Sequence, residues 1–143
     1  MKHLIFGFLA LFLASADSAL AQSEWRALIT GDRWAGYSVE GATKIDVSTA
    51  KSLHERGVKF LDARSNNRWQ QGHIPGAISL RLDKLLELAS KDEGAVFYCG
   101  GTDCKLSANA CAYALSLGYE NVYYFAEGYP GWKAAGHPIE KPE

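Results

Sequence analysis

The chain has 143 residues with a formal net charge of −1, which is one domain's length and enough to bury a core. The balanced charge gives no support for binding to nucleic acid or to an acidic membrane surface. Three cysteines are too few for a disulfide-stapled scaffold. Their odd number leaves at least one thiol unpaired within the chain, so chemistry is the better interpretation of these residues.

Residues 1–21 have the pattern of a secretory signal peptide. Lys2 provides a positive start, and the apolar run over residues 4–14 is too short to span a bilayer as a folded helix. Residues 19–21, Ala-Leu-Ala, fit the small-x-small rule for a cleavage site. The sequence therefore predicts export to a bacterial periplasm, with no stable membrane association after cleavage. An uncleaved N-terminal anchor is the alternative.

The rest of the chain is predicted to be an irregular extension over residues 22–40, with a candidate edge strand at 37–39, followed by one domain over 41–143. In that domain apolar strands alternate with helical patterns. Strands are expected at 43–45, 58–63, 78–80, 95–98 and 121–125, helices at 47–56, 82–89 and 107–117, and helical turns at 66–71 and at 132–135, the last after a turn over 128–131. This order predicts an α/β fold, with a central mostly parallel sheet and helices on both faces.

Residues 96–107 are the most informative stretch, because they have the order strand, cysteine, tight loop, helix. Cys99 lies at the end of the strand, where ligands of parallel sheets bind. Gly100 and Gly101 lack a Cβ and can adopt the φ values of a wrapped loop. Loop amides and a helix N-terminus favour both a thiolate and a small bound anion. We therefore interpret Cys99 as a catalytic nucleophile; a buried structural thiol is the alternative.

The loop after Cys99 is predicted to bind the substrate. Its candidate residues are Gly100, Gly101, Thr102, Asp103, Cys104 and Lys105. Lys105 contributes a positive charge, and Cys104 is either a redox partner of Cys99 or an inert thiol. Cys111, in an alanine-rich helix, is expected to be a small core residue. The cysteines have no nearby histidine pair, so neither a metal site nor a cofactor is predicted.

Five motifs in order, over about residues 43–139, resemble the rhodanese family of single-domain sulfurtransferases. They are Leu61-Asp62-Ala63-Arg64, Gly72-His73-Ile74-Pro75-Gly76-Ala77-Ile78, Phe97-Tyr98-Cys99, Gly118-Tyr119-Glu120-Asn121-Val122 and Glu127-Gly128-Tyr129-Pro130-Gly131-Trp132. The resemblance implies a rhodanese-like fold and a Cys99 persulfide that carries sulfane sulfur from a small anionic, thiosulfate-like donor to a thiol or cyanide-like acceptor. It also implies that Asp62, Arg64 and His73 order the loops.

The active loop departs from the family's pattern. An arginine usually lies five residues after the cysteine and a serine six, whereas Ser107 lies eight residues after Cys99 and Leu106 occupies the arginine's place. The loop is longer and its cup wider. In related folds a wider cup accepts phosphate or arsenate, but the phosphatase relatives need the missing arginine. Lys105 is expected to supply a cation instead, as a point charge.

The spacing Cys-x4-Cys and the ending over residues 124–132 are similar to a periplasmic rhodanese subgroup that accompanies quinoprotein alcohol oxidation. That subgroup usually has a tighter Cys-x3-Cys-Trp loop. Three functions therefore stay open: sulfur transfer by Cys99, thiol–disulfide redox chemistry by Cys99 and Cys104, and non-catalytic binding of an anion or sulfur.

Overall fold

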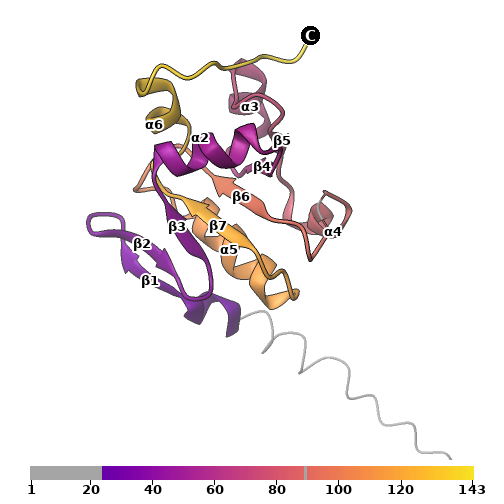
Figure 1. The fold of residues 1–143 in the computed structure, drawn as a ribbon. Helices are drawn as coiled ribbons and strands as arrows, with labels where there is room; N and C mark the ends of the chain where they lie inside the picture. The colour runs from indigo at the N-terminus through magenta and orange to yellow at the C-terminus, as the bar shows by residue number, and fades with distance from the viewer. Residues whose placement is uncertain (1–23, 89) are drawn as a thin grey trace, which may run out of the picture.

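The computed structural model describes residues 24–88 and 90–143, so the predicted signal peptide over residues 1–21 lies outside the described residues. Figure 1 shows the order of the elements along the chain. They are η1 (Trp25–Leu28), β1 (Ile29–Asp32), β2 (Gly36–Val39), β3 (Thr43–Ile45), α2 (Val47–Glu55), β4 (Lys59–Asp62), α3 (Asn66–Gln71), β5 (Ile78–Ser79), η2 (Leu82–Lys84), α4 (Leu85–Leu88), β6 (Ala95–Tyr98), α5 (Leu106–Ser116), β7 (Val122–Phe125) and α6 (Gly128–Ala134).

A five-stranded parallel sheet forms the centre of the molecule, in the strand order β3-β7-β6-β4-β5. Strand β6 lies in the middle and all four of its residues are buried. A central parallel strand is covered on both faces, which is why its sequence is a continuous apolar run. The predicted α/β fold with a mostly parallel sheet is confirmed.

The two faces of the sheet pack against different helices. Val96 and Tyr98 of β6 belong to the core cluster that includes Leu53 of α2 and Trp132 of α6. The alternate residues of the strand face the other cluster, which contains Phe97 and the buried alanines of α5. In Figure 1, α2 accordingly crosses in front of the sheet and α5 lies behind it. Helices therefore cover both faces, as the alternating pattern predicts.

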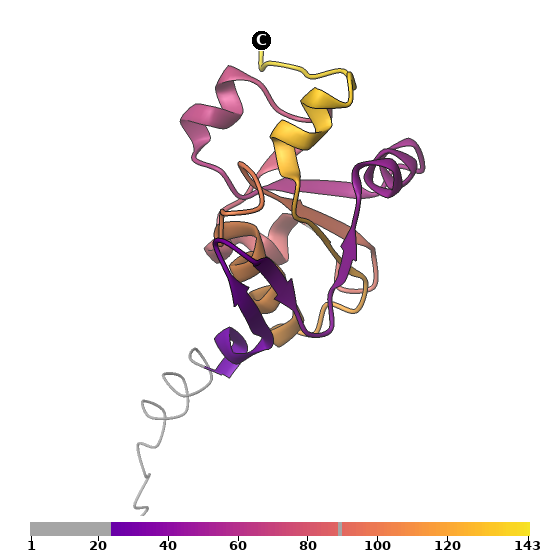
Figure 2. The ribbon, with the colours of Figure 1, turned by 90° about the vertical axis from the view of Figure 1, so that its left-hand side faces the viewer.

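Residues 24–40 are not irregular, contrary to the prediction for residues 22–40, whereas the strand expected at 37–39 is present as β2. Residues 29–39 form an antiparallel hairpin, β1 with β2, and its turn is held by the Asp32 carboxylate, which accepts hydrogen bonds from the amides of Trp34 and Ala35 at 2.8 and 2.7 Å. The segment packs against α5, as Figure 2 shows, and the ring of Trp25 meets that of Tyr113 edge-on at 5.9 Å. Strand β1 is mostly exposed, so its sequence lacks the alternation that predicts a strand.

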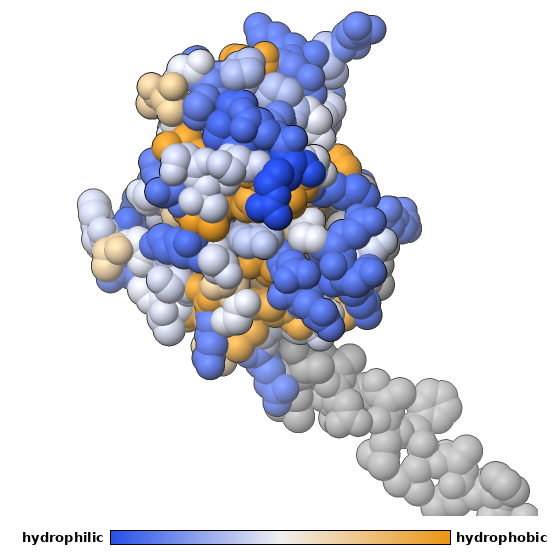
Figure 3. Space-filling view, in the orientation of Figure 1, coloured by the Kyte–Doolittle hydropathy of each residue, from blue (hydrophilic) through white to orange (hydrophobic). Residues whose placement is uncertain are grey.

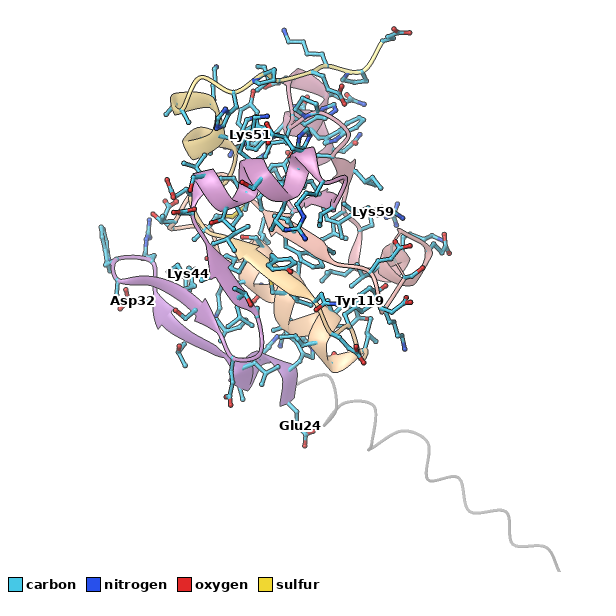
Figure 4. All side chains as sticks on the ribbon, in the orientation of Figure 1. Glu24, Asp32, Lys44, Lys51, Lys59 and Tyr119 are labelled. Carbon is cyan, nitrogen blue, oxygen red and sulfur yellow. A yellow bond between two sulfur atoms is a disulfide. The ribbon has the colours of Figure 1, made fainter. Side chains whose placement is uncertain are left out.

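The hairpin is also tied to the sheet by a side chain of β3. Lys44 lies beside the hairpin in Figure 4, and its Nζ donates a hydrogen bond of 3.0 Å to the carbonyl oxygen of Tyr37. Tyr37 is therefore held next to the edge strand of the sheet.

Most helix ends lie at residues whose local sequence favours a cap or a stop. Asp46 caps α2 through a hydrogen bond of 2.8 Å from the Thr49 amide, and Gly57 and Gly118 follow α2 and α5 with φ of 79° and 91°. Helix α6 is the exception, because it begins at Gly128 and not at residue 132. Pro130 lies in its first turn, where a missing N–H costs no hydrogen bond.

The region over residues 82–89 also differs from the single helix that was expected, since it is divided between the 3-10 turn η2 and the one-turn helix α4. None of the helices over residues 24–88 and 90–143 combines the length and apolar character needed to cross a membrane. The face of the molecule in Figure 3 is mostly hydrophilic, with hydrophobic residues mainly in its lower half.

Candidate functional site

The candidate site is the loop that joins β6 to α5. Cys99 follows the last residue of β6 and is only 2% exposed. The loop turns back on itself, because the Cys104 amide donates a hydrogen bond of 3.2 Å to the carbonyl oxygen of Gly101, whose φ is 134°. A disulfide joins Cys99 to Cys104, with their Cα atoms 6.3 Å apart. The structure thus brings the predicted nucleophile and its predicted redox partner together.

Backbone amides of this loop remain available for an anion. Within the described part of the chain, the amides of Gly100, Gly101, Thr102 and Asp103 donate to no protein acceptor. Helix α5 begins directly after the loop, and the side chain of its N-cap residue, Lys105, makes no capping hydrogen bond. The first-turn amides of a helix lack intrahelical partners and carry a partial positive charge. The loop and the start of α5 can therefore stabilise a negative charge.

Helix α6 fixes the backbone at Cys99 from the other side. The amide of Tyr129 donates a hydrogen bond of 2.9 Å to the carbonyl oxygen of Cys99. Gly128 approaches the same carbonyl with a φ of 59°, so closely that a Cβ at this position would overlap it. A glycine is therefore required here both by its conformation and by the space available.

A cleft of about 200 Å³ exposes the disulfide to ligands. It is lined by Arg64, Ser65, Arg68, Cys99, Cys104 and Leu106. The guanidinium of Arg68 lies close to the start of the loop. A Cβ atom built on Gly100 would be 3.2 Å from Arg68 Nη1. Arg68 and Arg64 are thus the cations that line the cleft together with the candidate nucleophile.

Arg68 was not among the predicted site residues, because residues 66–71 were interpreted only as a polar helical turn. Its spacing from Arg64 is the one signal that was available: Arg68 is the fourth residue after Arg64, in the segment before the Gly72 loop. That signal is weak, because an arginine on a short polar helix usually faces solvent.

Lys105 does not occupy the position that was expected for it. It was predicted to supply the cation of the loop, but its Nζ lies 5.8 Å from the ring centroid of Tyr37 and the residue does not line the cleft. A lysine that ends the loop at the start of α5 is directed toward the hairpin because Tyr37 offers an aromatic face there. Thr102 and Asp103 are exposed and also lie outside the cleft lining.

Asp62 and Arg64 form a buried ion pair below the cleft. Arg64 Nη2 donates to Asp62 Oδ2 and to the carbonyl oxygen of Gly72, both at 2.7 Å, and its guanidinium lies 4.0 Å from the ring centroid of Tyr129. Burial opposes the charge of Arg64, but the Asp62 carboxylate outweighs it and raises the pKa of Arg64. The pair therefore links the end of β4 to the Gly72 loop and to α6.

His73 connects the same loop to the C-terminal segment. Its Nδ1 lies 2.8 Å from the carbonyl oxygen of Trp69, and its Nε2 lies 3.2 Å from Glu140 Oε1. The backbones of His73 and Glu140 also exchange two hydrogen bonds of 2.9 Å. His73 is not among the residues that line the disulfide cleft.

Cys111 is the third cysteine, and it is fully buried and unpaired in α5. Burial raises the pKa of its thiol well above the ordinary value, so this thiol stays protonated and unreactive. Over the residues that the structure describes, no group of three or more His, Cys, Asp and Glu side chains is arranged to hold a metal ion.

Comparison with known proteins gives a consistent result. Residues 46–135 match the sequence model of the family described as Rhodanese-like domain. The thiosulfate sulfurtransferase GlpE of Haemophilus influenzae is 31% identical over 101 residues, which cover 68% of this chain and 93% of that protein. An HTH-type transcriptional regulator of Mycobacterium tuberculosis is 32% identical over 114 residues, 75% of this chain. The chain spans only 50% of the length of that regulator.

Solved structures agree with the fold. The crystal structure of the Alr3790 protein from Anabaena matches with a TM-score of 0.60 at 29% identity, over 68% of this chain and 80% of that one. A protein of unknown function from Rhodopseudomonas palustris, titled a possible tyrosine phosphatase, matches over 98% of this chain and 99% of its own with a TM-score of 0.58. Its identity is 23%, so this likeness concerns the fold alone.

Proposed function

The chain belongs to the rhodanese-like domain family, whose sequence model covers residues 46–135, and on that premise we propose that it is an exported sulfurtransferase acting through a Cys99 persulfide. It moves sulfane sulfur from a small anionic donor such as thiosulfate to a thiol or cyanide-like acceptor. The observation that supports this proposal best is the position of Cys99, at the end of β6 in a cleft that Arg68 also lines. The loop that follows has four amides that donate to no acceptor within the described part of the chain.

The first step requires Cys99 and Cys104 as thiols. The Cys99 thiolate attacks the outer sulfur of thiosulfate, the sulfur–sulfur bond of the donor breaks, and sulfite leaves with the bonding electron pair. Cys99 keeps the transferred sulfur as a persulfide. The loop amides and the start of α5 stabilise the thiolate and then the persulfide anion, because their partial positive charge lies close to the negative charge.

In the second step an acceptor removes the outer sulfur. Cyanide attacks it and leaves as thiocyanate, which restores the Cys99 thiolate. Alternatively the Cys104 thiolate attacks the inner sulfur, expels hydrosulfide and forms the Cys99–Cys104 disulfide. In this branch the transferred sulfur is reduced and two thiols are oxidised, so an external thiol must reduce the disulfide before the next turnover.

Intact-mass analysis after exposure of the reduced protein to thiosulfate tests the proposal. Wild type and Cys111→Ser are expected to gain one sulfur atom, and Cys99→Ala none. Cys104→Ser is expected to gain the sulfur and to keep it longer, because the internal branch is removed. A gain that persists without Cys99 contradicts the proposal. Thiocyanate production from thiosulfate and cyanide then reports on complete turnover.

A second candidate, thiol–disulfide redox chemistry, is favoured by the Cys99–Cys104 disulfide itself. Under this alternative Cys104→Ser abolishes turnover with a disulfide substrate, whereas sulfur transfer to cyanide survives that substitution under the first proposal. A non-catalytic binding module is the third candidate. It predicts measurable binding of an inorganic anion with no turnover of any sulfur donor.

Export is part of the proposal and rests on the signal-peptide pattern of residues 1–21. In a bacterial host the mature protein is expected in the periplasmic fraction, with Gln22 as its first residue. N-terminal sequencing of the fractionated protein checks both points, and a full-length chain that stays with the membrane fraction supports an N-terminal anchor instead.

A further inference from the structure

A second cleft adjoins the one that holds the disulfide. It has a volume of about 330 Å³ and is lined by Arg64, Arg68, Gln71, Gly72, Tyr129 and Lys133. Two of these residues, Arg64 and Arg68, also line the disulfide cleft. The two clefts therefore share two of their lining residues, and together their linings extend from Cys99 and Cys104 to Tyr129 and Lys133 of α6 as two parts of one groove. We call this the arginine groove.

The arginine groove has a positive charge that the protein does not neutralise. No acidic residue lines either cleft. The Asp62 carboxylate pairs with Arg64, but the guanidinium of Arg68 and the ammonium of Lys133 make no hydrogen bond or ion pair within residues 24–88 and 90–143. Two cations with a neighbouring amide, Gln71, form a surface that favours an anionic ligand.

The groove is also larger than thiosulfate requires. Five heavy atoms at about 30 Å³ each, the share of one water in the liquid, fill at most about 150 Å³. The second cleft alone has about twice that volume, and it shares Arg64 and Arg68 with the cleft that the disulfide lines. A ligand that occupies both parts needs a reactive group at the sulfur end and an anionic group several atoms away.

We propose that the arginine groove binds the carboxylate of a small organic thiol whose sulfur opens the Cys99–Cys104 disulfide. Arg68 is the residue that selects for the carboxylate, and Lys133 adds to the attraction. The inference rests on the proposed function in one respect, because it treats the disulfide as a state that must be reduced between turnovers. It names the class of thiol that does so.

The exchange proceeds in two balanced steps. Cys99 is almost completely buried whereas Cys104 is partly exposed, so the thiolate of the ligand attacks the sulfur of Cys104. The disulfide breaks and Cys99 leaves as a thiolate, stabilised by the loop amides and by Arg68. A second ligand thiolate then attacks the ligand sulfur of the mixed disulfide at Cys104. Two small thiols are oxidised to one disulfide, and Cys99 and Cys104 both become thiols.

Rates of disulfide opening with matched thiols test the inference. The oxidised protein is mixed with 2-mercaptoethanol, 3-mercaptopropionate or mercaptosuccinate, which have zero, one and two carboxylates. Samples are quenched with an alkylating reagent and analysed by mass, and each rate is divided by the thiolate concentration. Wild type is expected to prefer the carboxylate thiols about two- to tenfold, the range of one or two exposed ion pairs. Salt is expected to reduce this preference.

Substitutions then assign the preference to the groove. Arg68→Met is expected to remove most of it, Arg68→Lys to keep part of it, and Lys133→Met to reduce it. Arg56→Met is the matched control, because Arg56 is an exposed arginine that precedes β4 and thus lies at the opposite end of the sheet; its preference is expected to equal that of wild type. Circular dichroism of each variant confirms that the fold is retained.

Equal thiolate-corrected rates for all three thiols in wild type overturn the inference, and so does an unchanged preference in folded Arg68→Met. Neither result affects the persulfide test, which contains thiosulfate and no organic thiol. Conversely, if the protein accepts no sulfur from thiosulfate but still reacts faster with the carboxylate thiols, the inference on the arginine groove stands and the sulfurtransferase proposal is contradicted.

Discussion

The Tyr129 amide donates a hydrogen bond of 2.9 Å to the carbonyl oxygen of Cys99, which joins the loop after β6 to the start of α6. The two residues are thirty positions apart in the sequence. Because the contact is made by the backbone, it fixes the position of Cys99 whatever the oxidation state of its sulfur. Helix α6 is therefore part of the site that it borders.

Gly128→Ala is expected to disturb this contact. A residue other than glycine at positive φ costs about 1–3 kcal/mol, and the new Cβ also overlaps the Cys99 carbonyl. Gly136→Ala is the matched control, since Gly136 has a φ of 79° with no atom within 4 Å of the added Cβ. Urea denaturation should give a larger loss of unfolding free energy for Gly128→Ala than for Gly136→Ala. Equal losses of unfolding free energy would mean that the backbone near Cys99 moves to accommodate the new Cβ without a further loss of stability.

Asp62→Ala is expected to lower the free energy of unfolding by about 3–5 kcal/mol, because it leaves the charge of Arg64 buried without its partner. Glu55→Gln removes one member of an exposed pair, Lys51–Glu55 at 2.7 Å, and should cost less than about 1 kcal/mol. Denaturation midpoints of the two variants compare these values. A small loss for Asp62→Ala would show that water solvates the freed guanidinium.

Glu140→Ala is expected to loosen the loop that follows His73. The Glu140 carboxylate accepts a hydrogen bond of 2.6 Å from the Gly76 amide and contacts His73 Nε2. Hydrogen exchange of the Gly76 amide should accelerate, with a loss of about 1 kcal/mol in stability. Glu143→Ala, at the last residue of the chain, should leave that exchange rate unchanged. If hydrogen exchange of the Gly76 amide does not accelerate in Glu140→Ala, another group protects this amide.

Thiol titration should separate Cys111 from the other two cysteines. Burial raises the pKa of the Cys111 thiol, so its thiolate fraction in the folded protein is below that of an exposed cysteine at any given pH. The oxidised native protein should therefore show no fast-reacting thiol near pH 8, and one after denaturation. Alkylation of folded protein should become appreciable only at pH above the ordinary thiol pKa. Rapid labelling of Cys111 near neutral pH would contradict its burial.

Local patterns were sufficient to predict the fold class and the position of Cys99 at the end of a buried strand. The run over residues 95–98 is apolar because β6 is covered on both faces, and the cysteine and glycines after it mark the end of the strand. The helix ends at Asp46, Gly57 and Gly118 depend on hydrogen bonds and φ values within a few residues, so their signals are contained in the sequence.

The hairpin and the start of α6 depend on distant contacts, which is why the sequence patterns did not predict them. Strand β1 is mostly exposed, and the segment is held by packing on α5. Gly128 looks like part of a turn in the sequence, but its close approach to Cys99 is what positions the first turn of α6.

The sequence by itself determined the alternation of strands and helices in the domain, the candidate nucleophile and the short cysteine spacing, because these follow from periodicity and from neighbouring residues. Only the tertiary structure decided which cations line the cleft with the cysteines. Lys105 is close along the chain but is directed to Tyr37, whereas Arg68 comes from α3, which follows β4, the neighbour of β6 in the sheet, and lies close to Gly100. Charge acts through space, and the distance between two side chains in a folded protein is not given by their separation in the sequence.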